Sequence, residues 1–156
     1  MRNQRLSRRS FLKHSTVALG AVAAPNVVTT GALAAPGRKG ANDRVNIAYF
    51  GVGRRSQQLM QVPEDSRVVA YADVNTKRLD ELKARNKEAK VYQDYREMLA
   101  SPDVDAVIIA TPDHWHALHV IHACQEGKDA YCEKPLSLTV REGRAMVDAA
   151  RKHERV

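Results

Sequence analysis

Short apolar runs alternate with amphipathic segments from residue 45 to the end of the 156-residue chain. The apolar runs predict strands near 45–50, 67–72, 90–92, 105–110 and 129–132. The segments that follow them predict helices over 54–60, 76–89, 95–99, 113–125 and 140–153. Strands that alternate with helices are typical of parallel βαβ units, and apolar central strands indicate a sheet covered on both faces. The pattern therefore predicts an α/β fold built on a doubly wound parallel sheet.

Polar residues at the predicted helix boundaries support these limits. Asp94 with Glu97, and Thr139 with Glu142, have the spacing of a capping box. In that motif two side chains satisfy backbone N–H groups at the start of a helix. Gly127 is expected to end the helix before the fifth strand.

A targeting segment is predicted at the amino terminus, over residues 1–34. The string SRRSFLK precedes a mildly apolar stretch that ends in small residues. This order is typical of a secretory signal, and the pair Arg8-Arg9 resembles a twin-arginine signal. A disordered basic tail is the alternative. Residues 35–43 predict a linker, so the globular domain is expected over 44–156, in the periplasm or outside the cell.

The net charge of +7 and the pI of about 9.6 first suggest a nucleic-acid-binding protein. Residues 1–34 contain no acid and five basic side chains, which are Arg2, Arg5, Arg8, Arg9 and Lys13. The remaining chain has a net charge of only +2 and no basic patch, so we expect no nucleic-acid partner. Beyond the signal, no run approaches the ~18 apolar residues of a membrane span.

The two cysteines, Cys124 and Cys132, are too few for a disulfide scaffold and too far apart in sequence for a CxxC motif. Cys124 is expected near the end of a helix, and Cys132 at the end of the following strand. Their Cα atoms are therefore predicted to lie more than ~7 Å apart, too far for a disulfide.

Two glycines follow the first predicted strand directly, in the string GVGRRS. Gly51 permits a tight turn, and Gly53 allows the backbone to approach a pyrophosphate at the start of the next helix. Ser56 occupies the third position of the motif, where a small residue allows close packing and its hydroxyl is a candidate phosphate contact. Arg54, between these positions, joins the candidate cofactor residues.

An acid at the end of the second strand strengthens the glycine motif. Asp73 stands 22 positions after Gly51, close to the ~20 typical of an acid that binds the adenosine ribose. A cap on the next helix is its alternative role. A carboxylate there repels a 2′-phosphate, so the sequence predicts a Rossmann-type site for NAD, with NADP less favoured.

Four histidines, at positions 114, 116, 119 and 122, raise the question of a metal site. His119 and His122 are expected on a solvated helix face, and no HExxH motif or cysteine partner accompanies them, so no metal is predicted. His114 and His116 stand at the start of that helix, at the edge where ligands bind. Either can cap the helix or border the nicotinamide cleft, and His116 is a candidate cofactor residue.

The fifth predicted strand ends in the string EKP, at positions 133–135. It ends at the same edge of the sheet as Gly51, Asp73, Thr111 and Pro112, because parallel strands share that edge. Thr111 and Pro112 are therefore candidate cofactor residues as well. A surface Glu–Lys pair with a proline that opens a loop is the alternative interpretation of EKP.

The string ATPDHWHALHVIHACQEGKDAYCEKPLS, with GVGRRS and ADVN upstream, resembles the family of glucose–fructose oxidoreductase, inositol dehydrogenase and MocA-like proteins (Gfo/Idh/MocA). The resemblance covers residues 44–156. It implies a Rossmann domain in which Glu133 faces the nicotinamide side of the cofactor. It also implies that Lys134 borders the cofactor as the catalytic residue at the hydride-transfer centre. Pro135 would direct the chain there, through a cis bond.

The resemblance further implies a second α+β domain that forms the floor of a sugar pocket, and no such domain follows in this sequence. The expected function is the nucleotide-binding half of an exported NAD-dependent oxidoreductase that acts on a sugar or cyclitol. Its full-length parent is expected to be a homo-oligomer. Two alternatives stay open: a glycoside hydrolase of the same fold that retains NAD, and a catalytically inactive NAD-binding fragment. The resemblance implies that such hydrolases lack the lysine of EKP.

Overall fold

The computed structural model describes residues 44–156, so the predicted signal and linker lie outside the described residues. Each predicted strand is present within one residue of its expected limits. The elements in chain order are β1 (Val45–Phe50), α2 (Arg54–Gln58), β2 (Ser66–Ala72), α3 (Thr76–Arg85), β3 (Lys90–Tyr92), α4 (Tyr95–Leu99), β4 (Ala106–Ile109), the 3-10 helix η2 (Asp113–Trp115), α5 (His116–Gln125), β5 (Asp129–Cys132) and α6 (Val140–Lys152).

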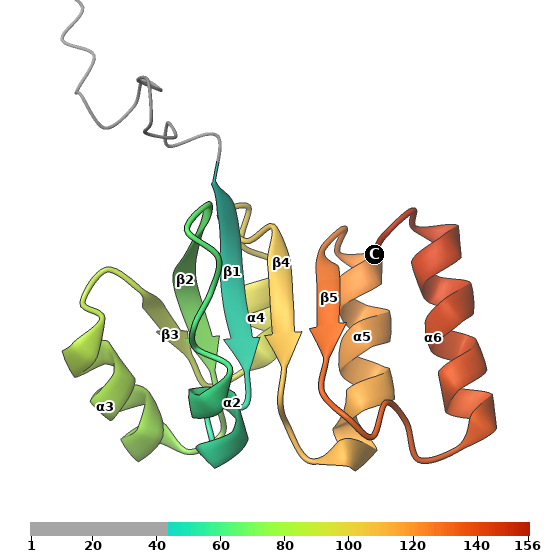
Figure 1. Cartoon of the computed structure of the whole chain (residues 1–156), viewed down its shortest axis with the longest axis horizontal. Helices are drawn as coiled ribbons and strands as arrows, with labels where there is room; N and C mark the ends of the chain where they lie inside the picture. Colours follow the sequence, from blue (N-terminus) through green and yellow to red (C-terminus); the bar gives the residue numbers. More distant parts are fainter. Residues whose placement is uncertain (1–43) are drawn as a thin grey trace, which may run out of the picture.

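The five strands form one parallel sheet in the order β3-β2-β1-β4-β5. The chain moves outward from β1 to β3 and then returns to place β4 on the other side of β1, so the order reverses between β1 and β4. The arrowheads in Figure 1 show that all strands end at the same edge. The predicted doubly wound sheet is therefore confirmed, and ligands of such sheets bind at this reversal point.

Helices cover both faces of the sheet; strands β1 to β4 contribute to two cores, whereas β5 contributes to one of them. On one face, Phe50 and Ile109 lie in a core enclosed by α4, α5 and α6. On the other face, Tyr49 packs with Leu79 and Leu82 of α3. Neighbouring residues of a strand point to opposite faces, and both faces here are apolar. This explains why the strands lack polar alternation.

The helix caps agree in part with the predicted boxes. Thr139 and Glu142 form the box at the start of α6, where Thr139 Oγ1 accepts from Glu142 N at 3.2 Å and Glu142 Oε2 accepts from Thr139 N at 3.0 Å. Asp94 caps α4 by accepting from Arg96 N at 2.9 Å, and the structure shows no reciprocal bond from Glu97. One box is therefore complete, and the other is a simple cap.

Two helices differ from their predicted extents. Helix α3 ends at Arg85, four residues early, because Lys83 Nζ bonds to the carbonyls of Lys87 and Ala89 and holds a turn there. The predicted helix 113–125 consists of η2 followed by α5. Within residues 44–156, no helix combines the length and apolar character that a membrane crossing requires.

Both cysteines are free thiols, as predicted. Cys124 is buried in α5, and Cys132 is half-buried at the end of β5. Burial raises the pKa of Cys132 to about 11, so this thiol is protonated at neutral pH. Neither side chain therefore has the thiolate character of a reactive cysteine.

The carboxyl-terminal residue lies beside β5, which forms one edge of the sheet. The Val156 carbonyl accepts from Ala130 N at 2.8 Å, and Val156 N donates to Asp129 Oδ1 at 2.9 Å. The chain after α6 therefore returns to the amino-terminal end of β5.

Candidate functional site

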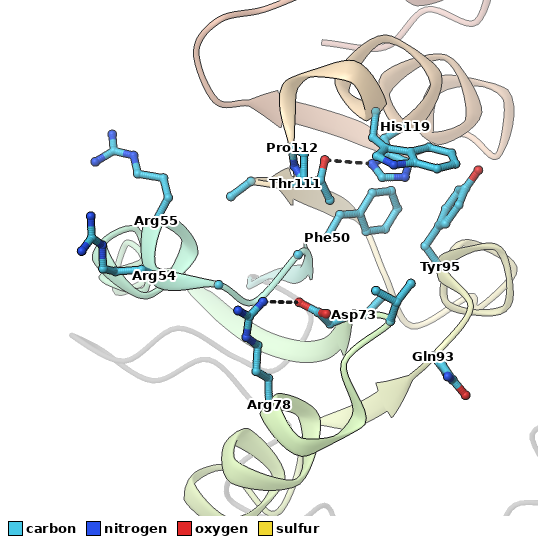
Figure 2. A pocket seen from close by; sticks show the side chains of 16 residues that line it. Phe50, Arg54, Arg55, Asp73, Arg78, Gln93, Tyr95, Thr111, Pro112 and His119 are labelled. Atoms are coloured by element: carbon cyan, nitrogen blue, oxygen red, sulfur yellow. Dashed lines mark hydrogen bonds and ion pairs between the residues drawn. The ribbon is translucent and has the colours of Figure 1, made fainter.

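A cavity of about 470 Å³ lies at the carboxyl ends of the strands, at the point where the strand order reverses. This volume is within the range of small-molecule and cofactor sites. Residues after β1, β2 and β4 line it, together with residues from α2, α3, α4 and α5. In Figure 2 the guanidinium groups of Arg54 and Arg55 lie toward one end, and the rings of Phe50, Tyr95 and His119 lie toward the other.

Gly51 forms the turn between β1 and α2, and its conformation requires glycine. Its φ is +76°, a region that other residues rarely adopt. A Cβ atom there would lie 2.9 Å from Thr111 Cγ2 and 3.0 Å from the Ala110 carbonyl oxygen. The turn after β1 therefore packs directly against the turn after β4. Gly53 also lines the cavity, directly before α2.

Asp73 connects the glycine turn to the turn after β2. Its Oδ2 accepts from Val52 N and its Oδ1 accepts from Asn75 N, both at 2.8 Å. Arg78 Nη1 lies 3.9 Å from Oδ2, as Figure 2 shows. The side chain lines the cavity, and each carboxylate oxygen can accept a further hydrogen bond from a hydroxyl. Asp73 thus anchors two loops before α3, with its carboxylate on the cavity wall.

Ser56 and Arg54 occupy different environments, although both belong to the glycine motif. Arg54 is exposed and lines the cavity. Ser56 is fully buried in α2 and does not line the cavity. Its Oγ has no hydrogen-bond partner among the described residues. This position agrees with a packing role for a small residue and does not support the predicted phosphate contact of the hydroxyl.

The prediction of a solvated face for His119 is wrong. His119 is buried, with its ring 5.6 Å from that of Trp115 in a stacked arrangement and 4.4 Å from that of Tyr95. Its Nδ1 lies 3.2 Å from Thr111 Oγ1. Burial, with smaller contributions from the neighbouring histidines at 116 and 122, lowers the pKa of His119 to about 4. His119 is therefore neutral at pH 7, and it lines the cavity.

The other histidines of this string also have defined contacts. His122 is half-buried and its Nδ1 lies 2.9 Å from the Tyr95 hydroxyl. His114 is exposed beside Asp113. His116 is buried and does not line the cavity; its Nδ1 lies 2.7 Å from the Pro135 carbonyl oxygen, and its Nε2 lies 2.9 Å from that of Thr111. Within the described part of the chain, no group of three His, Cys, Asp or Glu side chains has an arrangement that could hold a metal ion.

Glu133 is a buried carboxylate with a cationic partner on a distant segment. Its Oε2 lies 3.1 Å from Arg55 Nη2, and its backbone N donates to the Ile109 carbonyl at 2.9 Å. The hydrogen bond from Arg55 lowers the pKa of Glu133. Glu133 is therefore held as an anion at neutral pH.

Lys134 follows on the same segment but is exposed, and the Lys134-Pro135 bond is cis, as the resemblance implied. Neither Glu133 nor Lys134 lines the cavity. The structure thus gathers six predicted residues at the cavity, which are Gly51, Gly53, Arg54, Asp73, Thr111 and Pro112. Glu133 and Lys134 lie at the next strand end, and Arg55, which lines the cavity, connects the two places.

Sequence reasoning missed several residues of the cavity. Arg55 stands inside the quoted glycine motif, but nothing in that motif indicates its pairing with Glu133. Arg78 was not missed: it stands five positions after Asp73, close enough in sequence to weaken the expected preference for NAD over NADP, and the structure places it on the cavity wall. Tyr95 and Trp115 line the cavity because α4 and η2 begin at the same edge as α2, and no local pattern signals this.

A glycine turn, an acid after β2 and a cavity at the strand-order reversal together define a dinucleotide-binding Rossmann domain. Comparison with known proteins agrees. The family model Gfo/Idh/MocA, described as an oxidoreductase family with an NAD-binding Rossmann fold, matches residues 45–156. The chain belongs to this family.

Individual relatives of the chain are described as having different activities. The chain is 31% identical to a myo-inositol 2-dehydrogenase of Thermotoga maritima in an alignment of 112 residues that covers 69% of the chain and 33% of that protein. It is 32% identical to a glycosyl hydrolase family 109 protein of Shewanella putrefaciens in an alignment of 126 residues that covers 72% of the chain and 27% of that protein.

A probable dehydrogenase from Thermotoga maritima has a similar crystal structure, with a TM-score of 0.68 and 30% identity over 72% of the chain and 34% of that protein. The chain thus spans about a third, or less, of the length of these proteins.

Proposed function

We propose that this chain is the nucleotide-binding part of an NAD-dependent oxidoreductase that acts on a sugar or cyclitol by hydride transfer. The observation that carries the proposal is the cavity at the strand-order reversal, with Asp73 on its wall and Lys134 at the neighbouring strand end. The family match and the myo-inositol 2-dehydrogenase relative support the reaction class and the substrate class.

Each part of the site has a distinct task in this proposal. The glycine turn, with Gly51 and Gly53, admits the diphosphate close to the backbone. Asp73 accepts hydrogen bonds from the adenosine ribose hydroxyls with the lone pairs that Val52 N and Asn75 N leave free. NAD supplies the hydride acceptor when it is bound.

Lys134 acts at the reacting end. Its exposed ammonium donates a hydrogen bond to the substrate hydroxyl, stabilises negative charge on that oxygen and takes part in moving its proton. Glu133 on the same segment is fixed by Arg55, and in this proposal it faces the nicotinamide side of the cofactor. The rest of the longer protein would supply the floor of the substrate pocket.

NAD is proposed over NADP because the Asp73 carboxylate repels a 2′-phosphate. Arg54 and Arg78 line the same cavity and oppose that repulsion, so the preference rests on the Asp73 carboxylate. Direct titration of the chain with each cofactor by calorimetry tests the proposal. Binding of NAD with an affinity at least tenfold above that for NADP is expected, and failure to bind either would contradict it.

A glycoside hydrolase that retains NAD is the second candidate, since the Shewanella putrefaciens relative carries that description. The presence of Lys134 favours the dehydrogenase. Activity assays on the longer protein separate the two: a dehydrogenase forms NADH with free sugars or cyclitols, whereas a hydrolase releases sugar from a glycoside without net NADH.

Residues 1–34 complete the proposal as a twin-arginine signal, and the longer protein would act in the periplasm or outside the cell as a homo-oligomer. The order of charged, apolar and small residues supports the signal. Replacement of Arg8-Arg9 by two lysines should retain the protein in the cytoplasm, and fractionation of cells that express it measures this.

A further inference from the structure

His116 joins two segments of the site that belong to different strand ends. It is the first residue of α5, and only 1% of its surface is exposed. Its Nδ1 lies 2.7 Å from the Pro135 carbonyl oxygen, in the segment after β5, and its Nε2 lies 2.9 Å from the Thr111 carbonyl oxygen, in the segment after β4. Both distances are those of hydrogen bonds.

The two partners of His116 are of the same kind, because a carbonyl oxygen can only accept a hydrogen bond. A neutral imidazole carries one N–H group, and its second nitrogen presents a lone pair. In the neutral form, one of the two contacts would therefore place a lone pair against a carbonyl oxygen at 2.9 Å or less. An imidazolium carries two N–H groups and satisfies both carbonyls at once.

The carboxylates near His116 are engaged elsewhere. Asp113 Oδ1 accepts from His114 N at 3.0 Å, and Glu133 pairs with Arg55 at 3.1 Å. Glu142, at the start of α6, accepts from two backbone N–H groups of its own capping turn. The carbonyls of Pro135 and Thr111 are therefore the acceptors that hold the imidazole protons.

Two effects oppose a positive charge on His116. Its side chain is desolvated, and it stands at the amino end of a helix. Neighbouring cations add little to the free-energy cost of a positive charge on His116. His119 on the same helix is neutral at pH 7, because its pKa is about 4, and Lys134 carries its charge in solvent. The two charge-assisted hydrogen bonds are the terms that can offset the desolvation.

We propose that His116 is a positioning residue for Lys134, and that its imidazolium ties the segment of the lysine to the wall of the cofactor cavity. One N–H donates to the carbonyl next to Lys134, and the other donates to the carbonyl of Thr111. The role of Lys134 rests on the proposed function. The attachment of the two segments is a property of this chain alone and can be measured without any activity.

Nitrogen-15 NMR of the 156-residue chain tests the protonation state directly. Both ring nitrogens of His116 should be protonated at neutral pH. The Glu133 and Leu138 amide protons, which are hydrogen-bonded to Ile109 O and Glu142 Oε2, report on the segment that His116 holds. A bare ring nitrogen on His116 throughout pH 5 to 8 would overturn the proposal.

Variants test the attachment itself. His116→Phe removes both donors, whereas His116→Gln keeps an amide that can donate to one carbonyl. Exchange of the Glu133 and Leu138 amides should rise roughly tenfold or more in the Phe variant, as expected for the loss of a charge-assisted hydrogen bond, and less in the Gln variant. His114→Phe, at an exposed position of the preceding turn, is the matched control and should leave exchange unchanged. Equal exchange in all three variants would also overturn the proposal.

Measurements of NAD affinity and of turnover distinguish the proposal for His116 from the proposed function of the chain. In the chain, NAD affinity should change by less than about twofold in His116→Gln, because His116 does not line the cavity. In the longer protein, the same variant should lower kcat with little change in KM for NAD. If Lys134→Ala leaves turnover intact, the proposed function fails, while the exchange and NMR results still decide whether His116 holds the two segments.

Discussion

Arg55 Nη2 lies 3.1 Å from Glu133 Oε2, although 78 residues separate the two in sequence. Arg55 belongs to the turn that begins α2, and Glu133 follows β5, which is two strands away from β1 in the sheet. The arginine is half exposed, and the glutamate is buried. This ion pair is one direct link between the cofactor cavity and the segment that carries Lys134.

Arg55→Gln should destabilise the domain in a pH-dependent manner. Arg55 lowers the pKa of Glu133 below its ordinary value of 4.5, so the pair stabilises the fold at higher pH and ceases to do so as the pH falls below that value. Urea unfolding should show a lower midpoint for the variant at pH 7 and a smaller difference at pH 3. Arg85→Gln, on the exposed surface of α3, is the control. A difference that persists unchanged at pH 3 would contradict the ionic origin.

Gly51→Ala should cost more stability than Gly127→Ala. Both glycines have a positive φ, +76° and +72°, so each alanine adds backbone strain of about 1–2 kcal/mol. At Gly51 the new Cβ would also meet Thr111 Cγ2 at 2.9 Å, whereas at Gly127 it would meet no atom within 4 Å. Urea unfolding of both variants isolates the steric term, and NAD titration should show lost affinity for Gly51→Ala alone. Equal free energies of unfolding for the two variants would show that the turn at Thr111 moves to accommodate the new Cβ atom without loss of stability.

Asp73→Ser should shift cofactor choice from NAD toward NADP. The change removes acceptors for the ribose hydroxyls and the charge that repels a 2′-phosphate, while Arg54 and Arg78 remain. The ratio of the two dissociation constants should move roughly tenfold or more, the scale of a hydrogen bond to a charged group. Asp73 also anchors Val52 N and Asn75 N, so the unfolding midpoint must be measured beside the affinities. If the preference is unaltered in a folded variant, Asp73 serves only to hold its two turns.

Lys134→Ala should leave NAD binding to the chain unchanged, because the lysine is exposed and does not line the cavity. In the longer protein the same change should lower turnover by roughly 10² or more, the usual effect of losing a proton-transfer group. Calorimetry and NADH formation are the two measurements. Loss of NAD binding in the chain would make Lys134 a cofactor residue instead.

His119 should make the domain less stable as the medium becomes mildly acidic. Its pKa falls from 6.5 in the unfolded chain to about 4 in the fold, so the unfolded state binds more protons between these values. Stability should therefore fall by up to about 1.4 kcal/mol per pH unit from this residue as the pH drops from 6.5 toward 4. His119→Gln should flatten that slope, and His114→Gln, at an exposed position, should not. Identical slopes in all three proteins would contradict the lowered pKa.

The strands and the part of the cavity wall formed by Gly51, Gly53 and Asp73 could be predicted from sequence because their signals are local. Each strand is a short apolar run, and Gly51, Gly53 and Asp73 occupy fixed positions relative to strand ends. The environment of His119 could not be predicted from a helical projection. Its side chain meets Phe50 and Tyr95, which come from β1 and α4, and this contact exists only after the sheet is assembled.

The contacts of Glu133 and His116 with other strand ends could likewise not be predicted from local sequence patterns. The partners of Glu133 and His116 depend on β4 lying between β1 and β5, which is a property of the strand order. No pattern of spacing signals that Arg55 and Glu133 will approach. The predicted box at Asp94 lacks its second half, because the structure shows no bond from the Glu97 carboxylate to Asp94 N; the Asp94 carboxylate itself also pairs with the Arg96 guanidinium.

The hydrogen bonds of Val156 have a consequence for how the domain behaves beside other chains. An edge strand offers unpaired backbone groups to any extended segment, and proteins commonly blunt such edges. The β3 edge is only three residues long and begins with a lysine, so it is a poor template. The β5 edge is covered at its first residues by Val156, while the exposed side chain of Tyr131 stands further along the strand. Within the described residues, β5 is thus the longer of the two edge strands, and its backbone is already engaged at Ala130.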